Sequence, residues 1–424
     1  MSLKTLLVSR IAANLTGEKR LKRIRATRES RRIAAAALHT VDYFHEAADP
    51  YSHLAAQVLA DFAARYDITL QVHLAGPPAD WAAPERAQLE TYARVDGARL
   101  ARRAGLRFTD PGAQPAPDLV QRANLQLAAA IRAGTFLTDA PRIGDQLWAG
   151  TLGGSAGAVD LAAGSALREE LGHYLSGTLH YGGEWYWGID RLHFLEARLT
   201  ELGARRPGTG DALIFPPPVA PYGSARPAKP LELHYYLSFR SPYTYIAAAR
   251  AKALADAYGA ELKLRYVLPM VMRGLPVPQM KRRYISLDTA REARRLGVPF
   301  GRIVDPVGKP VERGYSILPW ARGQGRGYEF CHAFLSGVWS QGIDAGTDTG
   351  LKQIVEAAGL NWSAARQQLE SDTWRAEAEA NRAEMMSLGV WGVPSFRVGE
   401  VITWGQDRLW VIEEELKRQA GSSA

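Results

Sequence analysis

Residues 231–250 read LELHYYLSFRSPYTYIAAAR, and this stretch decides the fold. Its apolar and aromatic beginning, residues 231–237, predicts a buried strand, and the Ala-rich part after Ser241 predicts a helix. A Ser followed by Pro marks a helix start, with the Ser as N-cap. Free backbone N–H groups and the positive end of the helix dipole favour an anion there, including a thiolate. Ser241 is therefore either a helix cap alone or the centre of an anion site.

A second copy of this unit lies in the first half of the chain. The sequence from Val41 reads VDYFHEAADPYSHLAAQVLADFAARYDITLQVHL and aligns with the sequence from Leu233 at an offset of 192 residues. Near the ends of the copies, WGIDRL at 187–192 aligns with WGQDRL at 404–409 at an offset of 217, so the second copy is longer by 25 residues. The recurrence predicts an internal duplication. Matches at the first offset are Pro50/Pro242, Tyr51/Tyr243, Tyr66/Tyr258, Tyr92/Tyr284, Asp96/Asp288, Arg99/Arg291, Arg102/Arg294, Arg103/Arg295, Gly105/Gly297 and Phe108/Phe300.

A Pro-rich stretch, residues 204–230, separates the copies and predicts a semi-rigid linker that is not a packed element. The predicted organisation is a basic arm at 1–35, a first copy at 36–203, the linker, and a second copy at 231–420. In each copy, strand, Pro turn, helix and strand predict a right-handed βαβ unit with parallel strands. In the second copy we expect a helix at 243–258, a strand at 261–268, inserted helices at 284–296, 328–341 and 351–358, strands at 393–398 and 401–404, and a helix at 407–418.

The composition limits the classes of protein to which the chain can belong. The chain has 424 residues, 46% of them hydrophobic and 23% charged, which is ordinary for a globular protein of two or three domains. Its one cysteine, Cys331, excludes an internal disulfide and favours a reducing compartment, so we expect a cytoplasmic protein with a packed core thiol. The nine histidines follow no metal-ligand spacing, and no metal site is predicted.

The net charge of +8 is confined to the arm. Residues 1–32 contain ten basic and two acidic residues, so the remaining chain is neutral on balance and no nucleic-acid-binding body is indicated. The arm is expected to be a solvated helix, with contact to phosphates or an acidic surface as the alternative. Its opening is not typical of a secretory signal, and no apolar run reaches the length of a membrane span.

The strand, the S-P-Y-T turn at 241–244 and the helix resemble the active-site entry of the DsbA-like thioredoxin superfamily. Redox members carry C-P-x-C there. Kappa-class glutathione transferases and 2-hydroxychromene-2-carboxylate isomerases carry Ser. Here Ser241 and Thr244 occupy both cysteine positions, which excludes disulfide exchange at this site because that reaction needs a thiolate. The resemblance implies an α/β chain of two tandem thioredoxin-like domains, each with an inserted helical subdomain, the first of them degenerate.

The same resemblance assigns further residues to the site. It implies that Pro394 is cis and that the backbone of Val393 forms an edge for an extended peptide, glutathione in the relatives. It also implies that the corner formed by Trp404, Gly405, Gln406 and Asp407 binds the γ-glutamyl end of glutathione. The Asp407 carboxylate would face the amino group there. A structural role for Asp407, as the cap of the last helix, is compatible with this one.

Two basic residues are candidates for binding a substrate carboxylate. Arg291 lies on a helical face that it forms with Tyr284, Asp288 and Arg295, and Lys281 lies near that face. A solvated, salt-bridged face is the alternative. The isomerases have an Asn in the loop ahead of this helix, and residues 270–280, MVMRGLPVPQM, contain none. The missing Asn argues against the isomerase reaction more than against glutathione binding.

The first copy differs at the residues that matter for chemistry. Asp49 stands at the position of Ser241, where its carboxylate would repel a thiolate, and Gly177 stands at the position of Pro394. We expect this copy to be mainly structural and to form an internal pseudo-dimer with the second. A separate ligand at Asp49 is the alternative.

The predicted function is a glutathione-dependent isomerase or transferase acting on a small electrophile, aromatic or carboxylate-bearing. Ser241 would donate a hydrogen bond to the glutathione sulfur and, with the helix dipole, lower the pKa of the thiol. The competing hypothesis is a non-catalytic scaffold that binds a peptide along the Val393 edge.

Overall fold

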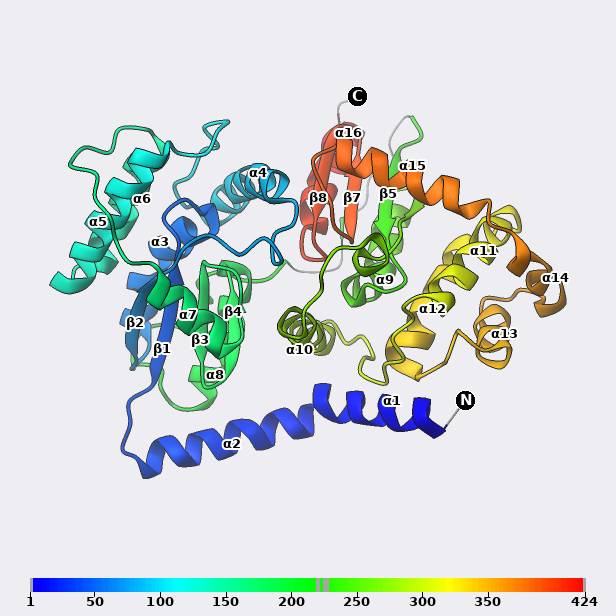
Figure 1. Ribbon diagram of the computed structural model, residues 1–424, viewed down its shortest axis with the longest axis horizontal. Coiled ribbons are helices and arrows are strands. Elements are labelled where there is room, and N and C mark those ends of the chain that lie inside the picture. The colour runs from blue at the N-terminus through cyan, green and yellow to red at the C-terminus, as the bar shows by residue number, and fades with distance from the viewer. Residues whose placement is uncertain (1–2, 219–221, 224–228, 422–424) are drawn as a thin grey trace. The chain divides into compact units, whose positions relative to one another are not determined.

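The computed structural model describes residues 3–218, 222–223 and 229–421, with side chains from residue 7 (Figure 1). The chain divides into two compact units. The N-terminal unit comprises residues 24–217, and the C-terminal unit comprises residues 218–424 together with 1–23. The boundary between residues 217 and 218 falls inside the predicted linker.

The N-terminal unit is built on a four-stranded sheet in the order β2-β1-β3-β4. Strands β1 (Thr40–His45) and β2 (Thr69–Leu74) are parallel and are joined through α3 (Pro50–Arg65), as the βαβ prediction requires. Strands β3 (Thr178–Tyr181) and β4 (Glu184–Trp187) are antiparallel. The inserted helices are α4 (Arg86–Ala104), α5 (Pro117–Ala133), α6 (Phe136–Trp148) and α7 (Ala162–Leu171), and η1 (Ile189–Arg191) and α8 (Leu192–Glu201) close the unit.

The C-terminal unit has the equivalent sheet, in the order β6-β5-β7-β8. Its strands are β5 (Glu232–Leu237), β6 (Glu261–Tyr266), β7 (Ser395–Val398) and β8 (Val401–Trp404). Helix α9 (Pro242–Tyr258) joins β5 to β6, and α16 (Leu409–Gly421) follows β8. The four predicted strands and the helix that follows the Pro turn are confirmed. The last helix begins at Leu409, two residues later than predicted.

The insertion between β6 and β7 contains more helices than the sequence predicted. Figure 1 shows α11 to α14 grouped beside the sheet. The helix predicted at 328–341 ends at Ser336 and continues as a π-turn, η3, that starts at a glycine. Helix α11 escaped prediction because Pro319 and two glycines interrupt its pattern. The elements are η2 (Met270–Arg273), α10 (Gln279–Arg295), α11 (Lys309–Gly323), α12 (Gly327–Ser336), η3 (Gly337–Gln341), α13 (Asp348–Ala357), α14 (Trp362–Arg366), η4 (Gln367–Glu370) and α15 (Trp374–Ser387).

The two sheets have the same register. Tyr236 pairs with Ser395 in the C-terminal unit, and Phe44 pairs with Thr178 in the N-terminal unit. These partners are related by the offsets of 192 and 217 residues that the sequence shows. The residues that recur in the sequence therefore occupy equivalent places in two sheets of the same strand order.

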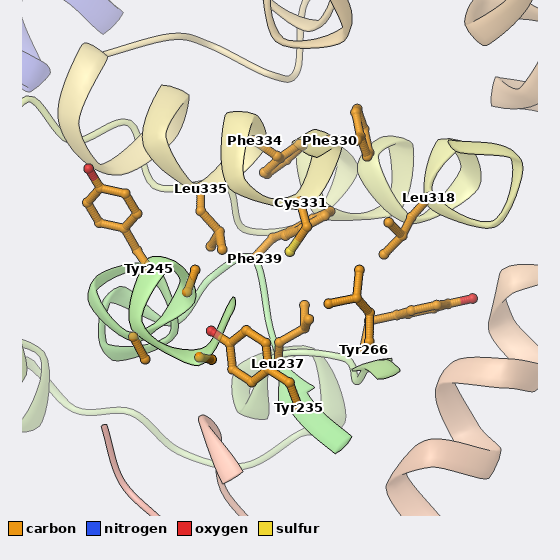
Figure 2. Packing of buried hydrophobic residues seen from close by; sticks show 14 of the residues in the cluster. Tyr235, Leu237, Phe239, Tyr245, Tyr266, Leu318, Phe330, Cys331, Phe334 and Leu335 are labelled. Atoms are coloured by element: carbon orange, nitrogen blue, oxygen red, sulfur yellow. The ribbon is translucent and has the colours of Figure 1, made fainter. Parts of the chain in front are cut away.

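Aromatic rings form the centre of the C-terminal core (Figure 2). The Phe239 ring stacks on Phe334, with centroids 4.0 Å apart, and also contacts the ring of Tyr315. Cys331 lies in the same cluster and is 1% exposed, so the predicted packed core thiol is confirmed. Burial raises the pKa of this thiol, which keeps it protonated and unreactive at neutral pH.

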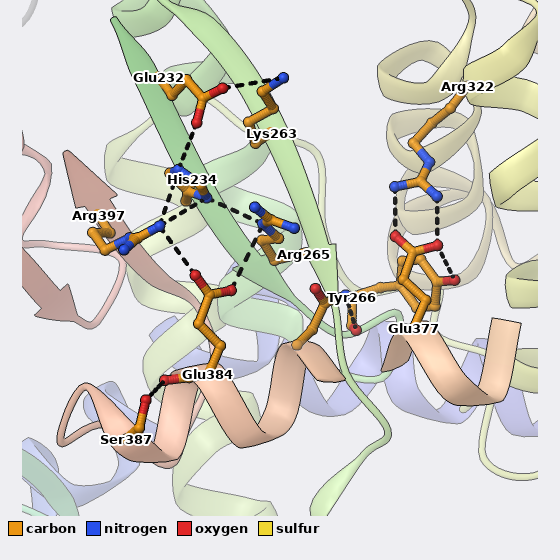
Figure 3. A network of polar contacts seen from close by, with 11 residues as sticks. Glu232, His234, Lys263, Arg265, Tyr266, Arg322, Glu377, Glu384, Ser387 and Arg397 are labelled. Carbon is orange, nitrogen blue, oxygen red and sulfur yellow. Dashed lines mark hydrogen bonds and ion pairs between the residues drawn. The ribbon is translucent and has the colours of Figure 1, made fainter. Parts of the chain in front are cut away.

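Helix α15 is fixed to the sheet by charged side chains (Figure 3). Glu384 accepts from Arg397 of β7 at 3.0 Å, and Glu377 accepts from the Tyr266 hydroxyl at 2.9 Å. His234 lies between Arg265 and Arg397. Burial, followed by these two guanidinium groups, lowers the pKa of His234. The imidazole is thus held neutral, and the cluster fixes the position of α15.

The predicted arm consists of α1 (Leu3–Thr16) and α2 (Glu18–Ala34), and it is divided between the two units. In the C-terminal unit, the Arg294 guanidinium donates to the carbonyl oxygen of Thr16 at 2.9 Å. In the N-terminal unit, Arg25 donates to both carboxylate oxygens of Glu184, at 2.7 and 2.8 Å. The arm is thus anchored at two points, while most of its basic side chains are exposed.

The first half of the predicted linker is packed, contrary to expectation. Phe215 is 3% exposed, and the Arg206 N–H donates to the carbonyl oxygen of Arg65 at 2.9 Å. One aromatic residue among the prolines buries enough surface to hold this segment on the N-terminal unit. Residues 219–221 and 224–228 of the predicted linker lie outside the described residues.

Neither a membrane-spanning helix nor a group of metal ligands is formed by the residues that the structure describes. None of their helices is both long enough and apolar enough to span a bilayer. Their His, Cys, Asp and Glu side chains form no group of three or more that could hold a metal ion.

Replacing Phe239 by Ala is expected to lower the free energy of unfolding of the C-terminal unit by about 3–5 kcal/mol, because the cavity would open among buried rings. Urea unfolding followed by fluorescence measures this change. The control, Leu287→Ala, removes a side chain that is 42% exposed. It should cost less than about 0.5 kcal/mol. An equal loss in the two variants would contradict the packing described here.

Candidate functional site

Ser241 lies at the carboxyl end of β5 and is the N-cap of α9, as predicted. Its Oγ accepts a hydrogen bond from the Thr244 N–H at 3.2 Å. The same hydroxyl donates to the carbonyl oxygen of Val393 at 3.3 Å, a long and therefore weak bond. Ser241 is half-buried, so its hydroxyl lies at the surface of the site and not in the core.

Val393 and Pro394 form the second part of the site. Their peptide bond is cis, as the resemblance implied. The Val393 carbonyl is the acceptor for Ser241, and within the described part of the chain its N–H has no hydrogen-bond partner. A free backbone donor next to a helix N-terminus can pair with an extended peptide.

The corner between β8 and α16 is tied to the same loop. The Gly405 N–H donates to the carbonyl oxygen of Pro394 at 2.9 Å. Gly405 has a φ of +108°, and a Cβ there would meet the Asp407 carboxylate at 2.9 Å. Trp404 is half-buried and packs against Trp391, with ring centroids 4.7 Å apart. The three predicted parts of the site are thus brought together by two hydrogen bonds.

Gln406 has a supporting position within this corner. It is 2% exposed, and its side-chain oxygen accepts a hydrogen bond from Arg250 of α9. Its Nε2 donates to Glu292 of α10 at 3.2 Å. Gln406 therefore joins two helices to the corner, and both ends of its side-chain amide are already engaged. Arg250 and Glu292 are the residues that sequence reasoning missed, although Arg250 is conspicuous as a basic residue in an Ala-rich helix.

Asp407 remains accessible. Its side chain is 19% exposed, and its Oδ1 lies 3.3 Å from the guanidinium of Arg408. Helix α16 begins at Leu409, so Arg408 directly precedes the helix and Asp407 lies one residue further back. Asp407 is therefore not in the usual N-cap position.

Arg291 does not reach the site as predicted. It is 8% exposed and pairs with Asp288 at 2.5 Å. Asp288 also accepts from the Tyr243 hydroxyl at 2.8 Å. The equivalent bond, from Tyr51 to Asp96, is 2.9 Å long in the N-terminal unit. These recurrent residues therefore fasten α10 to α9, and Arg291 is a structural partner of that bond, not a substrate ligand.

Lys281 lies in the first turn of α10 and is half-buried. Burial lowers the pKa of its ammonium group to about 8. The group is still mainly protonated at neutral pH, so it carries the positive charge that attracts a carboxylate. Lys281 is thus the basic candidate that the structure retains.

The N-terminal unit has the same framework with different chemistry. Asp49 caps α3, accepting from the N–H groups of Tyr51 and Ser52 at 3.2 and 2.9 Å. The Gly188 N–H donates to the Gly177 carbonyl at 2.8 Å, as Gly405 does to Pro394. A Cβ at Gly177 would meet the Ser52 backbone nitrogen at 2.9 Å and Asp49 Oδ2 at 3.0 Å, so the first turn of α3 and its cap leave no room for a side chain there.

Comparison with known proteins covers the C-terminal half of the chain. Residues 232–417 match the family model described as the DSBA-like thioredoxin domain. The 2-hydroxychromene-2-carboxylate isomerase of Pseudomonas putida is 25% identical over 200 residues, which cover 45% of this chain and 96% of that protein. The enzyme of the same name from Sphingobium xenophagum is 26% identical over 194 residues, which cover 43% of this chain and 97% of that protein.

Among solved structures, that of a 2-hydroxychromene-2-carboxylate isomerase is 24% identical with a TM-score of 0.38, covering 44% of this chain and 94% of that one. The family match does not extend into the N-terminal unit. The C-terminal half of the chain therefore contains a DsbA-like thioredoxin domain with a mixed α/β fold, and it is similar to 2-hydroxychromene-2-carboxylate isomerases over nearly their whole length.

Ser241→Ala should lower the free energy of unfolding of the C-terminal unit by about 0.5–2 kcal/mol, because the first turn of α9 loses its capping oxygen. The matched variant Ser241→Asn keeps such an oxygen and should stay within about 0.5 kcal/mol of the parent chain. Urea unfolding measures both changes. If Ser241→Ala were as stable as the parent, the hydroxyl would not be the cap described here.

Proposed function

We propose that the C-terminal unit is a glutathione-dependent isomerase or transferase of the 2-hydroxychromene-2-carboxylate isomerase type. Its substrate would be a small electrophile, aromatic or carboxylate-bearing. One observation carries the proposal: in a domain similar to those isomerases, the Ser241 hydroxyl lies at the start of α9, 3.3 Å from the carbonyl of Val393. A hydroxyl in this place can meet a thiolate without the repulsion that a carboxylate would cause.

The residues of the site fit glutathione in three respects. The Val393 N–H, unpartnered among the described residues, suits a carbonyl of an extended peptide. The accessible Asp407 carboxylate suits the α-ammonium group of the γ-glutamyl residue. The half-buried Trp404 offers an apolar face beside it. The side chain of Gln406 is already engaged, so only its backbone would contact glutathione.

Glutathione, when bound, supplies a thiol whose thiolate is a nucleophile toward electrophilic carbon. Ser241 would hold a hydrogen bond to that sulfur, and the N-terminal end of α9 would favour its negative charge. A hydroxyl proton serves one acceptor at a time, so Ser241 must turn from the Val393 carbonyl to serve the sulfur. Because the bond from Ser241 to the Val393 carbonyl is long and weak, breaking it costs little free energy.

Lys281 is proposed to hold the carboxylate of the substrate. An approaching anion would raise the lowered pKa of its ammonium group, so the protonated form would be favoured in the complex. The loop ahead of α10 lacks the Asn that the resemblance led us to expect, which leaves transfer as well as isomerisation open to this site.

The competing function is peptide recognition without catalysis along the Val393 edge. The free N–H of Val393 among the described residues favours it, because a backbone edge pairs with any extended peptide. This function would need neither the Ser241 hydroxyl nor the charge of Lys281, and substitution at these residues separates the two hypotheses.

We further propose that the two units arose by duplication of one ancestral domain. The shared strand order, the shared register and the recurrent Tyr–Asp bond support a common origin. The internal pseudo-dimer remains a prediction that follows from such an origin. A reducing, cytoplasmic setting would suit a site that works with a free thiol.

The proposal predicts that the chain converts 2-hydroxychromene-2-carboxylate, or transfers glutathione to a related electrophile, only when glutathione is present. Ser241→Ala should reduce the rate about 10- to 100-fold near neutral pH, because less of the bound thiol is ionised. Absorbance of the substrate follows the reaction.

Thr244→Val is the matched control. It removes the hydroxyl at the second former cysteine position, which is fully buried and has no hydrogen-bond partner among the described residues. This variant should keep the parent rate. No glutathione-dependent turnover by the parent chain, or equal losses in the two variants, would refute the proposed role of Ser241.

A further inference from the structure

A cavity of about 50 Å³ lies in the N-terminal unit, at the position equivalent to the candidate site of the other unit. Asp49, the counterpart of Ser241, lines it, together with Glu46 from the end of β1 and Glu90 from α4. A single water needs roughly 10–15 Å³ by this kind of measure, so the cavity admits a few waters or the head group of a small molecule.

The lining of the cavity is acidic. Glu46, Asp49 and Glu90 supply three carboxyl groups, and Arg86 is the one basic residue among the lining residues that the structure describes. Arg86 is partly engaged, since it donates to Asp80 at 2.9 Å and to the carbonyl oxygen of Pro78. The charge presented to a ligand is therefore negative on balance.

The Glu46 carboxyl group lies beside this space, and the Ser176 hydroxyl, which also lines the cavity, hydrogen-bonds to it. Asp49 is held by more donors, since it accepts from two backbone N–H groups and from the Ser52 hydroxyl at 2.7 Å. A carboxyl group that is withdrawn from water is costly to ionise, and a cation that donates to it lowers that cost.

A buried guanidinium lies behind the two carboxyl groups. Arg168 of α7 is 4% exposed and donates to the Ser176 hydroxyl at 2.5 Å and to the Gly76 carbonyl at 3.4 Å. Its Nε has no partner among the described residues, and no carboxylate lies within ion-pair distance of it there. Arg168 thus compensates Glu46 and Asp49 only from a distance, and Arg86 is the basic residue on the cavity side of the two carboxyl groups.

The walls of the cavity suit an organic cation better than a metal ion. The rings of Tyr51 and Trp187 both line it, in an edge-to-face arrangement with centroids 5.6 Å apart. Aromatic faces attract ammonium groups. The described residues supply no third ligand that would complete a metal site beside Glu46 and Asp49.

We propose that this cavity binds a small organic cation, a primary ammonium group, between the carboxyl groups of Glu46 and Asp49 and the rings of Tyr51 and Trp187. The inference is independent of the function proposed for the C-terminal unit. There, Ser238 and Ser241 occupy the positions of Glu46 and Asp49, and Met385 occupies that of Arg168, so the two units offer opposite chemistry to a ligand.

Binding of a cation in this cavity is expected to depend on pH, because Glu46 must lose a proton. Burial, together with the neighbouring Asp49, raises the pKa of Glu46 to about 8, while Arg168 and Arg86 act in the opposite direction. Glu90 also lines the cavity and adds negative charge. At neutral pH Glu46 is therefore largely protonated, and a bound ammonium group would expel that proton. Affinity for the cation should rise with pH up to the pKa and then level off.

The test is a saturation-transfer NMR titration of the full chain with n-propylammonium, with propionamide as the uncharged probe of similar size. We expect propylammonium to bind and its affinity to rise about tenfold per pH unit below the pKa of Glu46. Propionamide should show no transfer. Glu46→Gln, a neutral side chain of the same shape, should abolish the pH dependence and weaken binding at least about tenfold.

Glu170→Gln is the matched control, because it removes one exposed carboxylate from the same unit outside the cavity. It should leave the titration unchanged. Absence of transfer from propylammonium at any pH, equal transfer from propionamide, or an unchanged titration in Glu46→Gln would each overturn the proposal.

Discussion

The hydroxyl of Ser241 connects three parts of the C-terminal unit. It accepts from the first turn of α9, it donates to the carbonyl of Val393, and it follows the central strand β5. The Gly405 N–H closes the arrangement through the carbonyl of Pro394. A backbone donor, a hydroxyl and a helix N-terminus are thereby presented together to one region of solvent. The proposed chemistry depends on this small set of hydrogen bonds, because none of its members is reactive alone.

The two units share a framework and differ in the residue that caps the helix after the first strand. Both use the same sheet register, the same helix start and the same tyrosine-to-aspartate bond. Ser241 leaves a site in which an anion is tolerated. Asp49 fills the equivalent place with a carboxylate and lines an acidic cavity together with Glu46. One framework therefore carries a hydroxyl at this place in one unit and a pair of carboxyl groups in the other.

The sequence was sufficient for the framework and insufficient for the packing around it. The Ser-Pro turn predicted α9 and its cap, and the strand, turn, helix and strand pattern predicted the parallel pair in each unit, because these depend on neighbouring residues. Arg291 pairs with Asp288 on its own helix, which is the salt-bridged face that the sequence offered as the alternative. The partners of the Gln406 side chain lie on two other helices and leave no pattern in the sequence. Glu46 and Asp49 can be read in the sequence, but the cavity beside them arises only from the arrangement of α3, α4 and β4 around the loop that follows β1.

The central claim is that Ser241 and the start of α9 stabilise a thiolate. The most direct measurement is an ultraviolet absorbance titration of the thiol of glutathione bound to the full chain, in the parent and in Ser241→Ala. The account predicts that the pKa of the bound thiol lies at least about one unit below that of free glutathione and returns most of the way in the variant. A bound thiol with the pKa of free glutathione, or with the same lowered pKa in both proteins, would contradict it.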